Sequence, residues 1–159
     1  MTKEEKQTFV LRISQANRTE LIVIMQDILI SYLQDAKKEK EGKNEDGFIN
    51  CLQLARYAVL ELRKSLDRNN AVGKNIYPIY TFIDKEIAKG IIGRRMENLD
   101  EIIDIVSKLR NSFHEVSKED HSGSMMSNTQ TVYAGLTYGK DQLNENLWEA
   151  SSKKRGFYV

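Results

Sequence analysis

The apolar segment at residues 20–36, ELIVIMQDILISYLQDA, constrains the fold most, because it is too apolar for a helix with one face fully in water. At about 100° per residue, most of its apolar side chains fall on one broad arc, as in a helix at the core of a bundle. The members of this arc are Leu21, Ile22, Ile24, Met25, Ile28, Leu29, Tyr32, Leu33 and Ala36. Val23 and Ile30 are left on the opposite side, one heptad apart and beside Gln26. This narrower stripe must be covered either by the chain's own helices or by a partner.

Composition indicates a single soluble domain with no electrostatic preference for nucleic acid. The 159 residues can bury one core, and 24 basic side chains nearly balance 23 acidic ones. The chain has one cysteine, Cys51, which forms no disulfide within a chain and favours a reducing compartment. The longest apolar run, residues 21–25, is far shorter than a membrane span, and the charged start MTKEEKQ lacks a signal core. We therefore expect a cytoplasmic protein that does not insert into membranes.

Helix signals recur along the first three quarters of the chain. A short amphipathic helix is expected at residues 2–14, and longer ones at residues 17–41, 45–66, 75–93 and 98–113. Asn17 with Glu20 and Asn98 with Glu101 have the spacing of a capping box, and Pro78 is expected in the first turn of its helix. Short loops between four long helices predict an all-α fold, an antiparallel four-helix bundle with a short extra N-terminal helix and a C-terminal tail.

The sequence changes character near residue 117. We expect residues 1–117 to form the bundle domain and residues 118–159 to form a polar linker and an aromatic tail. The linker reads SKEDHSGSMMSNTQ, and the tail carries aromatic residues between Val132 and Trp148. Residues 132–148 are predicted to shield part of a binding groove.

The residue patterns of enzymes and metal proteins are missing. His114 and His121 have no Cys or second His at ligand spacing, and the Glu-x-x-His pattern of bundle metalloproteins is absent. There is no Gly-rich phosphate loop and no Ser-His-Asp set. We therefore expect no catalytic residue, no metal site and no cofactor, and consider the chain not to be an enzyme. Apolar groove surface remains as the functional material.

Four segments carry a family resemblance: the apolar helix at residues 20–36, ELRKSLD at residues 61–67, IYTFI at residues 79–83, and the stretch from Asn98 to LRNSF at residues 109–113. In this order, over about residues 9–114, they resemble the flagellin export chaperone (FliS) family. The apolar helix at residues 20–36 resembles the second helix of that family, and ELRKSLD at residues 61–67 resembles its Glu-Leu-x-x-Ser-Leu-Asp signature. IYTFI at residues 79–83 is similar to its Leu-Tyr-x-Tyr-Ile segment, and the pattern from Asn98 to LRNSF at residues 109–113 is similar to its final helix. Gln26 stands where the family usually has Tyr, and Ile28 where it usually has Gly.

The resemblance implies a cytosolic chaperone that binds the C-terminal segment of flagellin and keeps it from polymerising until the type III export gate accepts it. No catalysis is implied. A preformed apolar groove would take the client by helix-in-groove binding. The expected partner-binding residues are Ile22, Val23, Gln26, Ile30, Leu33, Ile49, Tyr57 and Leu60. Two alternatives stay open: a regulatory or adaptor bundle that binds a different flagellar partner, and a homodimerisation module.

Overall fold

The computed structural model describes residues 1–126, in which every regular element is a helix. The elements are α1 (Lys3–Gln15), α2 (Arg18–Glu41), α3 (Glu45–Ser65), α4 (Ala71–Gly93) and α5 (Leu99–Glu119). The predicted all-α bundle is therefore confirmed. None of the helices in this range is both long enough and apolar enough to cross a membrane.

Met1–Met125 form one compact unit, and a second unit is Met126–Val159. The predicted aromatic tail, including residues 132–148, lies outside the described residues, so its shielding role stays a prediction. The expected domain boundary after residue 117 also stays a prediction.

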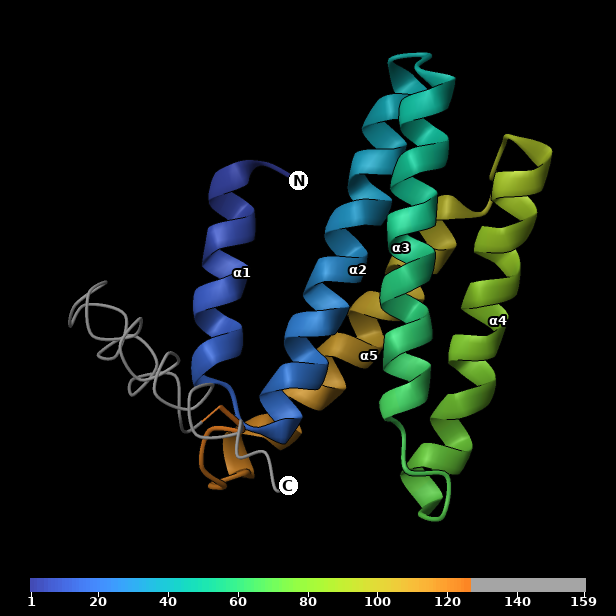
Figure 1. Ribbon diagram of the computed structural model, residues 1–159. Coiled ribbons are helices and arrows are strands. Elements are labelled where there is room, and N and C mark those ends of the chain that lie inside the picture. The colour runs from blue at the N-terminus through green and yellow to red at the C-terminus, as the bar shows by residue number, and fades with distance from the viewer. Residues whose placement is uncertain (127–159) are drawn as a thin grey trace, which may run out of the picture. The chain divides into compact units, whose positions relative to one another are not determined.

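The helices pack in the order α5, α2, α3, α4. α2 contacts α3 and α5, α3 contacts α4, and α1 packs mainly on α2. Figure 1 shows α2, α3 and α4 running alternately up and down, while α5 crosses behind α2. α2 is therefore the helix around which the other elements are arranged, as its apolar sequence predicts.

Two capping boxes fix the first two helices. The side chain of Asn17 accepts a hydrogen bond from the backbone N–H of Glu20, and the Glu20 carboxylate accepts from the N–H of Asn17, at 2.8 Å each. This confirms the predicted box. Thr2 and Glu5 form the same reciprocal pair at the start of α1. Such pairs satisfy two of the backbone donors that a helix start leaves free.

Two expectations about helix starts were wrong. α4 begins at Ala71 because Asn70 caps it, with its side-chain oxygen accepting from the backbone N–H of Gly73 at 2.7 Å. Pro78 therefore lies inside the helix, on an exposed position, and not in its first turn. Asn98 precedes α5 but forms no capping hydrogen bond. Its side-chain amide donates instead to Glu86 of α4, at 2.9 Å, and so ties the loop before α5 to α4.

The core is one cluster of buried, mostly aliphatic side chains from α2, α3, α4 and α5, and it includes the aromatic side chain of Tyr80. On α2 the buried face differs from the predicted arc. Val23 and Gln26 are buried, 3% and 0% exposed, whereas Met25 and Ile28 are half-buried. The fully buried members of the core, with less than 2% exposure, include Leu29, Leu33, Leu52, Val59, Leu62, Tyr80, Ile83, Ile87, Ile102 and Val106.

Candidate partner-binding groove

An apolar groove of about 480 Å³ lies between the start of α2 and the end of α3. Its floor is built by Leu21, Ile22 and Met25 of α2 together with Leu62 of α3. Polar side chains and one methionine border it: Arg18, Glu61, Ser65 and Met125. The arrangement is an apolar floor with a polar rim, which suits the apolar face of an amphipathic segment.

The half-buried apolar surface continues from this groove along α2. Ile28 and Tyr32 follow Met25 at helical spacing and are half-buried against the core. On α3, Cys51 is half-buried and Leu54 is 39% exposed. We call the hollow with its floor of Leu21, Ile22, Met25 and Leu62 the α2–α3 groove. Ile28, Tyr32, Cys51 and Leu54 are partly exposed apolar residues further along the same two helices.

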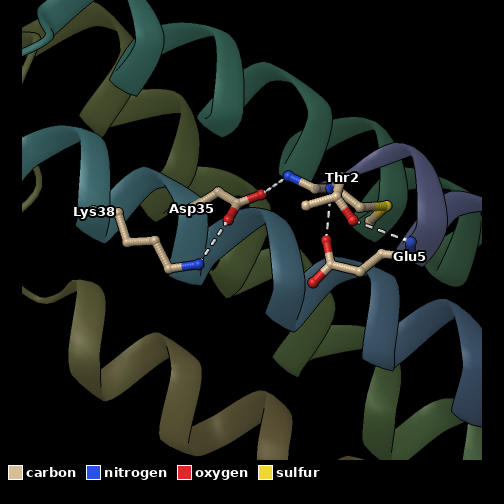
Figure 2. A network of polar contacts seen from close by, with 5 residues as sticks. Thr2, Glu5, Asp35 and Lys38 are labelled. Atoms are coloured by element: carbon tan, nitrogen blue, oxygen red, sulfur yellow. Dashed lines mark hydrogen bonds and ion pairs between the residues drawn. The ribbon is translucent and has the colours of Figure 1, made fainter.

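Charged residues surround Asp35, further along α2. The N-terminal ammonium of Met1 pairs with one oxygen of Asp35, and Lys38 donates to the other at 3.2 Å (Figure 2). Burial by itself would raise the pKa of Asp35, but the hydrogen bonds from the ammonium and Lys38 outweigh it and lower the pKa. Asp35 therefore stays ionised and holds the N-terminal segment against α2.

Cys51, beside this network, carries a thiol of reduced acidity. Burial, followed by the negative charges of Asp35 and Glu39, raises its pKa above the ordinary value. A thiol with a raised pKa forms less of the reactive thiolate. Cys51 thus packs against the core as a small apolar side chain.

A second hollow, of about 370 Å³, lies where α1 meets α2 and α5. It is lined by Arg12, Gln15, Ala16, Glu20, Val23, Ile24, His114 and Ser117. Beside it, Asp27 of α2 accepts from Arg12 of α1 at 2.7 Å and from Arg110 of α5 at 2.8 Å. No residue of α1 is buried. α1 therefore depends on half-buried side chains such as Phe9 and Ile13 and on polar contacts with α2.

Gln26 and Tyr80 form a buried polar pair in the core. The Gln26 amide nitrogen donates to the Tyr80 hydroxyl at 2.8 Å, and both side chains are 0% exposed. Burial raises the pKa of Tyr80 to about 12, although the hydrogen bond from Gln26 acts in the opposite direction. The amide oxygen of Gln26 has no partner among the described residues. The pair links α2 to α4 at the site where the sequence departs from the family's usual tyrosine.

The structure places the predicted binding residues in three different settings. Val23, Gln26 and Leu33 are buried, and for Val23 the chain's own helices supply the cover, one of the two possibilities that the sequence left open. α1 and α5 cover Val23, and Gln26 reaches Tyr80. Ile22 lines the groove, while Ile30, Ile49 and Leu60 are half-buried. Tyr57 is 67% exposed. The role of all eight residues in binding stays a prediction.

The groove was not predicted from the sequence, because periodicity placed Leu21, Met25, Ile28 and Tyr32 on the core face of α2. One signal was available, since the predicted arc held nine residues, more than neighbouring helices can cover fully. In residues 1–126 no group of three His, Cys, Asp or Glu side chains is placed to hold a metal ion. The chemistry that this part of the chain offers is apolar contact with a polar border.

The family model described as "Flagellar protein FliS" matches residues 1–120 of the 159-residue chain. This range covers the five helices of the part of the chain that the structure describes. No curated protein matches the chain.

Proposed function

The chain belongs to the FliS family of flagellar export chaperones, and on that premise we propose that it binds the C-terminal helical segment of flagellin in the α2–α3 groove. The complex keeps flagellin from polymerising in the cytoplasm and delivers it to the type III export gate. The observation that carries this proposal is the groove of about 480 Å³ with its floor of Leu21, Ile22, Met25 and Leu62.

Helix-in-groove binding explains why a chaperone needs such a surface. A segment that folds only in the filament exposes an apolar helix face beforehand, and a preformed groove can cover that face. The half-buried side chains of α2, from Leu21 to Tyr32, repeat every three or four residues, which matches the spacing of apolar residues on a bound helix. Arg18 and Glu61 at the rim can pair with charges on the client.

α1 has a place in the same proposal, because it covers Val23 and lies beside Asp27. With no buried residue, α1 can leave α2 at a modest cost in free energy. Its departure would open the side of α2 that carries Val23, which α5 still borders, and would offer the client a second apolar surface apart from the α2–α3 groove. In that open form Val23 would contact flagellin, as the sequence predicts.

Calorimetric titration of the full chain with a C-terminal flagellin segment tests the proposal. Met25→Gln keeps the length of the side chain and removes its apolar end, and we expect it to weaken binding about tenfold, the loss expected for one apolar side chain. Ile92→Gln is the matched control, because Ile92 is 84% exposed near the end of α4. Equal affinity of both variants and the unchanged chain would contradict binding in the groove.

One observation favours the alternative of self-association or of a different flagellar partner. Leu54 and Tyr57 lie one turn apart on α3 and are 39% and 67% exposed. Analytical ultracentrifugation of Tyr57→Ser and of the unchanged chain distinguishes self-association from binding of a different partner. A dimer that Tyr57→Ser dissociates would favour a homodimerisation module, whereas a monomer in both cases would leave this surface for another protein.

A further inference from the structure

The six residues that follow α5, residues 120–125, lie against the connection between α1 and α2. They begin at Asp120, the C-cap of α5, and end at Met125 in the wall of the α2–α3 groove. The family match ends at residue 120, so residues 121–125 lie beyond it. Their contacts are with residues more than 100 positions earlier in the chain.

Asp120 uses each of its three oxygens. Its backbone carbonyl accepts from the Asn17 side-chain amide at 3.0 Å, and one carboxylate oxygen accepts from the Thr19 hydroxyl at 2.6 Å. The other carboxylate oxygen accepts from the backbone N–H of Ser122 at 3.0 Å. The last bond folds the segment into a turn of the kind that Asp favours, and the first two tie that turn to the start of α2.

Two further bonds reach the end of α1. The Ser124 hydroxyl donates to the carbonyl oxygen of Ser14 at 3.2 Å, and the backbone N–H of Met125 donates to the carbonyl oxygen of Ala16 at 3.0 Å. The last carbonyl groups of a helix lack partners within the helix, so these bonds satisfy groups that would otherwise need water. The segment thus holds both sides of the α1–α2 connection.

Met125 extends the same segment into the groove, which its side chain lines together with Ile22 and Glu61. We propose that residues 120–125 form a strap that locks α1 against α2 and narrows the α2–α3 groove. Release of the strap frees α1 and widens the groove in one step. The effect of the strap on α1 stands by itself, and its effect on client access rests on the proposed function.

The weak attachment of α1 makes the strap effective. α1 has no buried residue, and Arg12, which pairs with Asp27, keeps a 40% exposed side chain. Exposed ion pairs contribute little to stability. The Met1–Asp35 pair holds the start of α1, and the hydrogen bonds at the α1–α2 connection hold its end. Loss of the bonds at the connection therefore shifts the population toward a form in which the end of α1 is open.

Hydrogen–deuterium exchange of the full chain tests the strap without any client. Thr19→Val removes the hydroxyl that Asp120 accepts from and keeps the shape of the side chain, while Asp120→Ala removes both carboxylate bonds. We expect the amides of α1 to exchange about fivefold faster in Thr19→Val, as the loss of one hydrogen bond predicts, and at least as fast in Asp120→Ala, which loses two. The amides of α3 and α4 should keep their rates.

Ser122→Ala is the matched control, because Ser122 contributes only its backbone N–H to the strap. Exchange in α1 of this variant should equal that of the unchanged chain. Unaltered α1 exchange in Thr19→Val and Asp120→Ala would overturn the strap. Faster exchange that Ser122→Ala shares would also overturn it, since the effect would then not come from the Asp120 bonds.

Titration with the flagellin segment separates this inference from the proposed function. If Thr19→Val speeds exchange in α1 and also has an affinity for the segment about fivefold higher than that of the unchanged chain, strap and groove act together. If exchange in α1 changes but neither Thr19→Val nor the unchanged chain binds the segment, the strap stands and the flagellin proposal fails. If both proteins bind the segment equally and exchange is unchanged, the strap fails and the proposed function stands.

Discussion

Gln26 and Tyr80 show what a polar pair does inside an aliphatic core. Their hydrogen bond satisfies the Gln26 amide nitrogen, and the Gln26 oxygen has no partner in the described part of the chain. A buried polar group without a partner loses its hydration and gains nothing in return. The pair therefore fixes how α2 meets α4 more than it adds to stability.

Removing one member of this pair should be worse than removing both. Tyr80→Phe leaves the Gln26 amide unpaired and should lower the free energy of unfolding by about 1–3 kcal/mol. Adding Gln26→Leu to Tyr80→Phe replaces both groups by apolar ones of similar size and should restore most of that loss. Urea unfolding of the two single variants and the double variant measures this. A double variant that loses the sum of the single losses would contradict it.

The raised pKa of Tyr80 predicts a loss of stability in alkali. The hydroxyl has its ordinary pKa near 10 in the unfolded chain and about 12 in the fold, where burial disfavours the phenolate. The contribution is therefore complete below about pH 10 and is lost as the pH rises through 12. Denaturant unfolding between pH 9 and 12 should show the unchanged chain losing stability faster than Tyr80→Phe. Parallel curves would contradict the assignment, because other groups titrate equally in both proteins.

Among single residues, the sequence predicted the Asn17–Glu20 box because both partners are three positions apart on the same turn. It could not predict that Asn98 binds Glu86, because that contact joins two helices. It could not predict the burial of Gln26 either, since the residues around Gln26 give no sign of a tyrosine 54 positions away. Hydrogen bonds between residues close in the sequence can be predicted from it, whereas contacts between separate helices cannot.

At the scale of the elements, the turn before α4 depends on a glycine. Gly73 lies in the first turn of α4, and a Cβ built on it would overlap the backbone carbonyl of Asp67. Backbone atoms cannot move aside as a flexible side chain can. The connection from α3 to α4 is therefore close-packed around this residue.

Gly73→Ala should lower the free energy of unfolding by about 2–3 kcal/mol through this overlap. Gly93→Ala, at the end of the same helix, is the matched control, because its Cβ would meet no described atom within 4 Å. Since alanine favours helix over glycine, Gly93→Ala should gain up to about 1 kcal/mol. Thermal unfolding followed by circular dichroism measures both changes. A Gly73→Ala protein as stable as Gly93→Ala would contradict the close packing.

Helix type and number were readable from periodicity, but the start of α4 was not. The residues DRNNAVG look like a loop because Asn and Gly favour turns. In the fold, the same asparagine at position 70 caps α4, and the helix begins four residues before the predicted start. Cap and turn use the same residue types, so the sequence alone leaves such a boundary open.

At the scale of the whole molecule, the broad apolar helix predicted at residues 20–36 is the axis of the bundle, but its faces are assigned differently. The stripe with Val23 is covered by α1 and α5, and the stripe with Met25 borders the open groove. Periodicity gives the angle between two side chains on a helix and cannot say which neighbour lies over each. The position of the groove thus depends on packing that only the structure provides.

The central claim is that the α2–α3 groove binds the C-terminal segment of flagellin. The most direct measurement is calorimetric titration of that segment into the full chain and into Met25→Gln and Ile92→Gln. Saturable binding to the full chain and to Ile92→Gln, with affinity about tenfold lower for Met25→Gln, is the predicted result. Absence of binding to the full chain, or equal binding to all three proteins, would contradict the claim.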